Sequence, residues 1–170
     1  MMKRMKRLGA LALTLALGMS VLAGCSSNAE AEGGRKLIYN LGEDPDTIDP
    51  TLNTSVGSST LIASTFEGLM ILDENEKAIY GVAKDMQISE DQLTYTFTLR
   101  DDAKWSYGQK VTANDFKFSW LRALNPETAA EYAYQLFYIK NGQAYNKGEV
   151  TAEEVGIEVV DESTLKVTLE

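Results

Sequence analysis

An alternating segment near the middle of the chain constrains its fold more than any other feature. Over residues 93–99, large apolar side chains occupy every second position and threonines stand between them. Successive side chains of a β-strand point to opposite faces, so this pattern predicts a strand with one buried and one wetter face. Any fold of this chain has to cover that apolar face.

A charged turn follows this strand and leads into the clearest predicted helix. Thr112 is the expected N-cap, and Asp115 three residues later completes a shortened capping box. Asn125-Pro126 ends the helix, because the residue before a proline avoids the helical conformation. The apolar residues at helical spacing are Phe116, Trp120, Leu121 and Leu124. We expect both tryptophans, Trp105 and Trp120, to lie in the core rather than to form binding platforms.

The other segments predict an α+β domain with a mixed or antiparallel sheet and packed helices. Before residue 93 we expect a strand over 36–41, a loop over 43–50, a helix over 58–66 capped by Ser58 or Ser59, a strand over 68–72 and a turn over 73–76. After residue 126 we expect a helix over 127–139, turns at 141–142 and 148, a helical turn over 151–154, and a hairpin of 156–160 with 164–169. The chain stops within the last strand, so we expect it to be the front piece of a longer protein.

The N-terminus carries the pattern of a bacterial lipoprotein signal. A basic stretch over residues 3–7 precedes an apolar run over 8–23, which is short for a membrane span and suits a secretory leader. Leu22-Ala23-Gly24-Cys25 closes this run, and the Cys25 thiol is the expected site of lipid attachment, as diacylglycerol and palmitate. We therefore predict a signal peptide over 1–24, a flexible lipid-anchored tether over 25–34, and an extracytoplasmic location at the cell membrane. An ordinary secreted protein with an incidental Cys25 is the alternative.

Composition excludes several classes of function. The 170 residues contain no histidine and one cysteine, which excludes internal disulfides, the usual zinc and copper sites, and nucleophilic sites that need an imidazole. The leader holds four of the 16 basic residues and none of the 25 acidic ones, so the remainder is near −13, which disfavours nucleic acid as a partner. Asp49 and Glu67 are interpreted as structural carboxylates rather than as an acid–base pair. We expect no enzyme activity, no cofactor and no metal.

One block is specific enough to suggest a family. Residues 95–116, continuing to Ser119-Trp120, run from the alternating strand through Tyr107-Gly108 into the capped helix. This block resembles the signature of the bacterial extracellular solute-binding proteins of family 5, which serve oligopeptide ABC importers. Further similar segments occur in the family's order at 49–50, 66–69, 81–83, 122–129 and 161–169, so the resemblance covers about residues 35 to 170. Two positions depart from it: Tyr107 stands where Asn or Asp is usual, and Glu131 where proline is frequent.

The resemblance implies the N-terminal part of a periplasmic-binding-protein type II-like fold, in which two lobes close around a ligand. Residues 35–72 would begin the first lobe, residues 73–170 would form the accessory domain, and the second lobe would be absent. The implied function is capture of oligopeptides outside the membrane for the permease subunits of an ABC importer. Two alternatives stay open: a non-transporting or truncated surface lipoprotein, and a specialised receptor for dipeptides, pheromones or metal chelates.

The resemblance also implies candidate ligand contacts. In that family an extended segment after the Asp-Pro motif pairs with the peptide backbone like an added strand, which suits a receptor that accepts many side chains. By position this segment is Thr54, Ser55 and Val56, and a plain surface loop is the alternative. Tyr132 aligns with a tyrosine that lines the peptide cleft, and an aromatic buried between domains is the alternative there.

Overall fold

The computed structural model describes residues 37–42 and 44–170, so the predicted signal peptide, Cys25 and the tether lie outside the described residues. The chain divides into two units, Met1–Asn40 and Leu41–Glu170. Every described helix and strand belongs to the second unit. The predicted strand over 36–41 is wrong where the structure describes it, since residues 37–41 form no strand. Branched and aromatic residues favour a strand only when a neighbouring strand pairs with their backbone.

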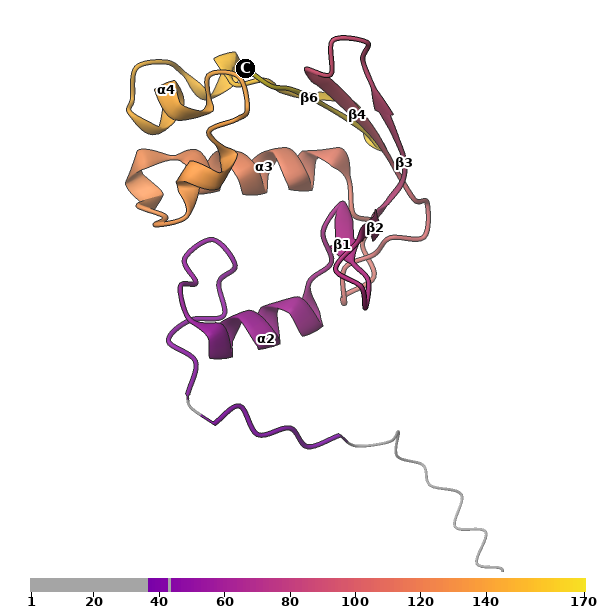
Figure 1. Ribbon diagram of the computed structural model, residues 1–170, viewed down its shortest axis with the longest axis vertical. Helices are drawn as coiled ribbons and strands as arrows, with labels where there is room; N and C mark the ends of the chain where they lie inside the picture. The colour runs from indigo at the N-terminus through magenta and orange to yellow at the C-terminus, as the bar shows by residue number, and fades with distance from the viewer. Residues whose placement is uncertain (1–36, 43) are drawn as a thin grey trace, which may run out of the picture. The chain divides into compact units, whose positions relative to one another are not determined.

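Four antiparallel strands form the main sheet of the second unit, in the order β3-β4-β6-β5 (Figure 1). The central strand β4 (Thr94–Leu99) pairs with β3 (Ala83–Ile88) on one edge and with β6 (Thr164–Thr168) on the other. β5 (Ile157–Asp161) completes the sheet beside β6. The predicted strand over 93–99 and the predicted terminal hairpin are therefore confirmed, whereas β3 was not predicted.

The register of these strands divides the sheet into an apolar and a polar face. Directly opposed residues of antiparallel strands share a face. One row across the four strands is apolar and consists of Met86, Phe97, Leu165 and Val159, while the adjacent row is polar and consists of Gln87, Thr96, Lys166 and Glu158. Lys166 and Glu158 form an ion pair in the polar row. The alternation seen over residues 93–99 thus extends across the whole sheet.

Helix α3 (Ala113–Leu124) packs on the apolar face of the sheet (Figure 1). Its predicted capping box is present, because the backbone N–H of Thr112 donates to Asp115 Oδ2 at 2.7 Å. The most deeply buried leucines are Leu99, Leu124 and Leu165, each with no exposed surface, and Phe116, Trp120 and Leu121 pack against the core that they form. The core prediction for Trp120 is confirmed.

The core prediction for Trp105 is wrong. Trp105 is half-buried outside the core cluster, and its ring lies parallel to that of the exposed Tyr107, with centroids 6.3 Å apart. The tight turn over 105–108 explains this position, because the N–H of Gly108 donates to the carbonyl of Trp105 and places both aromatic rings beside the same hairpin. Gly108 has φ 92°, which accounts for the glycine at this turn.

A helix and a small hairpin precede the main sheet. Helix α2 (Val56–Thr65) and strand β1 (Met70–Leu72) confirm the predicted helix and strand, and β1 pairs with the unpredicted β2 (Ala78–Tyr80) around the predicted turn. The N-cap of α2 is Ser55 instead of Ser58 or Ser59, because the Ser55 hydroxyl accepts from the N–H of Ser58 at 3.3 Å. The helix therefore starts two residues earlier than expected.

The predicted helix over 127–139 is wrong. This stretch contains the short 3₁₀ helices η1 (Pro126–Thr128) and η2 (Ala133–Leu136), and the left-handed Ala129 at φ 51° separates them. Tertiary packing decides here, because η2 lies against α3 and brings the buried Ile139 into the core. Helix α4 (Gly142–Asn146) follows the expected turn, and η3 (Ala152–Glu154) confirms the predicted helical turn.

The described residues therefore form an α+β unit with antiparallel sheets, as predicted. None of the described helices is long and apolar enough to cross a membrane.

Candidate ligand-binding site

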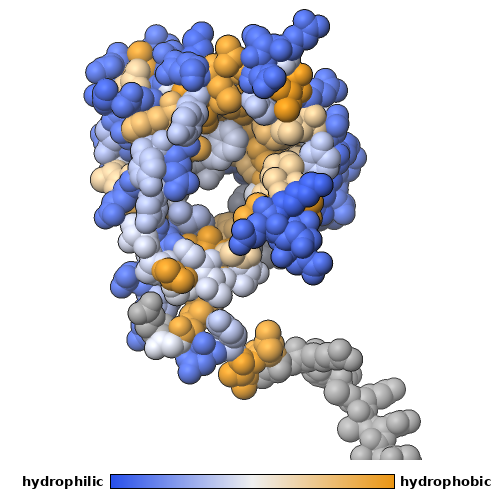
Figure 2. All heavy atoms as spheres, in the orientation of Figure 1, coloured by the Kyte–Doolittle hydropathy of each residue, from blue (hydrophilic) through white to orange (hydrophobic). Residues whose placement is uncertain are grey.

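A cavity of about 1010 Å³ lies between one side of α3 and the segment that contains α2. The space-filling view shows the molecule hollowed between these elements (Figure 2). Its lining includes five aromatic side chains, which are Phe66, Trp105, Phe116, Phe118 and Trp120. Ligand-binding pockets are commonly large and lined by aromatic side chains, so this cavity is a candidate binding site.

One edge of the cavity is closed by an ion pair between Asp49 and Arg122. Arg122 lies in the last turn of α3, and its Nη1 and Nη2 donate to Asp49 Oδ1 and Oδ2 at 2.9 and 2.6 Å. The backbone N–H of Thr51 also donates to Asp49 Oδ1, at 2.9 Å. Together these bonds hold the pKa of Asp49 below its usual value, chiefly through the Arg122 fork and against the opposing effect of burial. Asp49 is therefore a charged structural anchor, as the sequence predicted.

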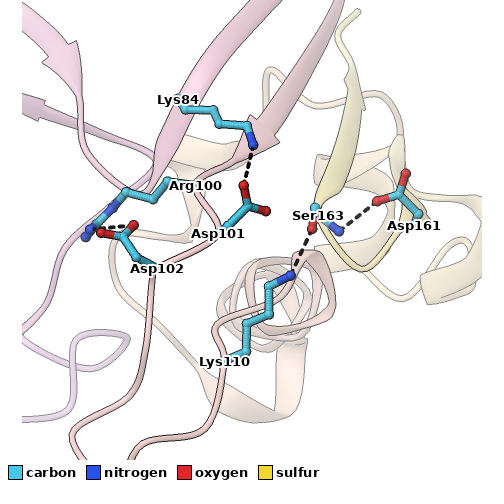
Figure 3. Close-up of polar contacts among 7 residues, drawn as sticks. All are labelled: Lys84, Arg100, Asp101, Asp102, Lys110, Asp161 and Ser163. Atoms are coloured by element: carbon cyan, nitrogen blue, oxygen red, sulfur yellow. Dashed lines mark hydrogen bonds and ion pairs between the residues drawn. The ribbon is translucent and has the colours of Figure 1, made fainter.

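A second ion pair closes the opposite edge of the cavity. Arg100 follows β4 directly, and its Nη2 donates to Glu67 Oε2 at 2.5 Å while its Nη1 donates to Asp102 at 3.2 Å. The Glu67 hydrogen bond is the main cause of a raised pKa for Arg100. Figure 3 shows Arg100 with Asp102, next to the separate Lys84–Asp101 pair. Glu67 is thus a structural carboxylate too.

Residues 50–66, which we call the bridging segment, join these two ion pairs. Its first turn is ordered by hydrogen bonds that continue from Asp49, whose carbonyl accepts from the N–H groups of Leu52 and Asn53 at 3.2 and 3.1 Å. Asn53 in turn accepts from the N–H of Ser55 at 3.1 Å and donates to the hydroxyl of Ser59 at 2.8 Å. These bonds form a continuous series from α3 to the N-terminus of α2.

The structure distinguishes the three predicted contact residues Thr54, Ser55 and Val56 from one another. Ser55 is extended, but its N–H donates to Asn53 and its carbonyl accepts from Ser59, so its backbone is already used. Val56 opens α2 and is not extended. Thr54 is exposed, and its N–H and C=O make no hydrogen bond with another described residue. Of these three residues, Thr54 alone has both its N–H and its C=O outside any hydrogen bond within the described part of the chain.

Tyr132 is the N-cap residue of η2. Its side chain is half-exposed and meets the ring of Tyr134 edge-on, with centroids 6.0 Å apart. Among the described residues, no hydrogen bond, ion pair or ring contact joins Tyr132 to residues 54–56. The residues that line the cavity include neither Tyr132 nor any of residues 54–56. The described part of the chain does not bring the predicted contacts together.

Sequence reasoning missed both arginines of this site. Arg122 and Asp49 are 73 residues apart, and Arg100 and Glu67 are 33 apart, so no local pattern pairs them. The sequence offered one indirect signal, since the two carboxylates and the two arginines each lie in a segment that resembles the family. Within the described residues, no group of acidic or cysteine side chains could hold a metal ion.

Comparison with known proteins identifies the family. The model of the bacterial extracellular solute-binding proteins, family 5 (middle), matches residues 77–170. The oligopeptide-binding protein OppA of Bacillus subtilis is 39% identical over 163 residues, which are 94% of this chain and 30% of that protein. The chain belongs to this family. It spans about 30% of the length of this curated relative.

Two solved structures show the same fold. Listeria monocytogenes OppA bound to peptide superposes with a TM-score of 0.71 and 43% identity, over 72% of this chain and 24% of that one. Haemophilus influenzae OppA in complex with RPPGFSPFR gives a TM-score of 0.72 and 36% identity, over 76% of this chain and 26% of that one. The expected likeness to periplasmic peptide-binding proteins is confirmed at the level of the fold.

The Asp49–Arg122 pair predicts a pH dependence of stability. Because the pKa of Asp49 is lowered in the folded state, its stabilising effect is fully present above the ordinary value of 3.8 and is lost as pH falls through the lowered value. We expect Asp49→Asn to lower the urea midpoint at pH 7, and the gap from wild type to shrink steadily below pH of about 4. Asp46→Asn, in the same loop but without an ion pair among the described residues, is the control. A gap of constant size from pH 7 to pH 3 would contradict this account.

Proposed function

We propose that the protein is the substrate-binding component of a peptide ABC importer, which captures oligopeptides outside the membrane and delivers them to permease subunits. The observation that carries the proposal is the free backbone of Thr54 on a segment anchored at both ends. Family membership supports it, because two relatives in this fold are described as bound to peptides.

Backbone recognition explains how one site can accept many sequences. The N–H and C=O groups of Thr54 can pair with the corresponding groups of an extended peptide, as one strand pairs with the next. Those groups are common to all peptides, so affinity from them does not depend on side chains. Specificity would then come from pockets of loose fit around the side chains.

Catalysis is not part of the proposal. The chain has no histidine, and the two carboxylates at the cavity edges are paired with arginines. The lowered pKa of Asp49 keeps its carboxylate ionised at neutral pH, so it has no proton to give as a general acid, and the Glu67 carboxylate is taken up by its ion pair with Arg100. We therefore infer that ligands are bound and released unchanged.

We further propose that residues 35–72 begin the first lobe of the receptor and that residues 73–170 are its accessory domain. A second lobe would supply the opposite wall of the cleft, and Tyr132 stays a proposed contact on the strength of the family resemblance alone. Closure of two lobes around the peptide would then bury it, as in hinge-closing binding proteins.

Lipid anchoring completes the proposal. The basic stretch, the apolar run and the Leu22-Ala23-Gly24-Cys25 sequence support cleavage before Cys25 and acylation of its thiol. Residues 25–34 would then act as a flexible tether that keeps the receptor near its permease at the extracytoplasmic face.

A proline at position 54 tests the backbone role. Thr54→Pro removes the N–H donor, so we expect affinity for tri- to pentapeptides of unrelated sequence to fall about tenfold, equally for all of them. Titration calorimetry on the full-length protein measures this. Thr54→Ala is the matched control because it removes the side chain and keeps the N–H, and it should bind like wild type. Equal affinities for Thr54→Pro and wild type would rule out this contact.

Lipid attachment predicts a change of partition. In a bacterial host, wild type should enter the detergent phase of a Triton X-114 separation, and Cys25→Ser should move to the aqueous phase with its leader uncleaved at position 24. Intact-mass measurement should show the added acyl mass on wild type alone. Wild type that lacks any acyl mass would refute the anchor and favour an ordinary secreted protein.

A further inference from the structure

The bridging segment is attached to the rest of the unit mainly at its ends. Its helix α2 is exposed along most of its length, and Ser58 is its only buried residue. The two ends meet arginines that belong to different elements, Arg122 of α3 at Asp49 and Arg100 after β4 at Glu67. The cavity lies beneath the segment between these points. The segment is therefore held from its two ends, by the charge pairs at Asp49 and Glu67 and by the backbone hydrogen bonds of Gly68 and Leu69, more than by burial of α2 itself.

The two arginines stand beside the most deeply buried leucines of the unit. Arg100 is next to Leu99 and Arg122 is two residues from Leu124, and both leucines are fully buried in the core. Each arginine thus fixes one end of the bridging segment relative to the sheet and α3. The fork from Arg122 to both oxygens of Asp49 fixes direction as well as distance, which a single hydrogen bond would not do.

We propose that Arg122 and Arg100 are positioning residues for ligand binding, which place the Thr54 backbone at a fixed height and angle relative to α3. This inference rests on the proposed function. Thr54 is five residues from Asp49, and the intervening bonds through Asn53 and Ser55 leave its backbone free. Arg122 therefore acts on the ligand through Asp49 and this turn, without touching it. Arg100 limits the motion of the far end of the segment.

The test compares arginine variants of the full-length protein with a matched ion-pair variant. Arg122→Met and Arg100→Met each remove one anchor, and Arg122→Lys keeps the charge but loses the fork. Lys84→Met is the control, since it breaks the Lys84–Asp101 pair of similar length, 3.0 Å, outside the bridging segment. Trialanine is the ligand probe, and the measurements are its Kd and the hydrogen exchange of residues 50–66.

We expect Arg122→Met to weaken trialanine binding about tenfold and to accelerate exchange in residues 50–66 while β4 and α3 stay protected. Arg122→Lys should lie between Arg122→Met and wild type, Arg100→Met should have a smaller effect, and Lys84→Met should have none. In the double variant Asp49→Asn/Arg122→Met, the Kd should be that of the single variants, because both remove the same pair.

Two results would overturn the inference. One is an unchanged Kd and unchanged exchange in Arg122→Met. The other is a weaker Kd that is accompanied by equally faster exchange throughout β4 and α3, which would indicate general destabilisation. If wild type binds neither trialanine nor any other short peptide, the proposed function fails instead, and the exchange of residues 50–66 still decides whether the arginines position the segment.

Discussion

The pairing of β4 with strands on both of its edges is the constraint on which the rest of the unit depends. Because β4 is central, its alternating side chains dictate which face of β3, β6 and β5 is apolar. That face fixes α3 through the buried Leu99, Leu165 and Leu124. The end of β4 then delivers Arg100, and the last turn of α3 delivers Arg122. The packing of the core therefore sets the distance between the backbone positions of Arg100 and Arg122.

The site combines two kinds of interaction with different uses. The sheet and α3 are joined by apolar burial, which is strong but indifferent to direction. The bridging segment is joined to them by arginine–carboxylate pairs, which are individually weak at a partly exposed site but have strict geometry. A segment fixed in this way can hold a backbone group at a set position while its own surface stays available. That combination suits the proposed function, in which the peptide backbone is recognised and varied side chains are tolerated.

Residue patterns predicted the fold where local and tertiary preferences agree. The threonine alternation of β4, the Thr112–Asp115 capping box and the terminal hairpin all follow from short-range rules. The prediction of a helix over 127–139 was wrong because Ala129 is left-handed and interrupts it, and the η2 turn that follows packs against α3. The prediction that Trp105 lies in the core was wrong because a turn fixes its ring beside that of Tyr107. β3 went unpredicted because its side chains, largely exposed on an edge strand, carry no clear alternation.

The candidate site was predicted less completely than the fold. Sequence reasoning recognised Asp49 and Glu67 as structural, but their arginine partners depend on contacts across 73 and 33 residues, which no local pattern reveals. The resemblance to the family suggested residues 54–56 as a candidate ligand segment, and because Ser55 is already hydrogen-bonded and Val56 is helical, Thr54 is the residue that we propose for backbone pairing. Within the described residues, no hydrogen bond, ion pair or ring contact connects Tyr132 to residues 54–56.

Native mass spectrometry of the full-length protein, purified gently from its host, shows whether its ligands share a peptide backbone or a single structure. We expect a spread of bound masses that fragment into short peptides of unrelated sequence, because recognition through the backbone does not select side chains. A single discrete bound mass that is not a peptide would contradict recognition through the peptide backbone.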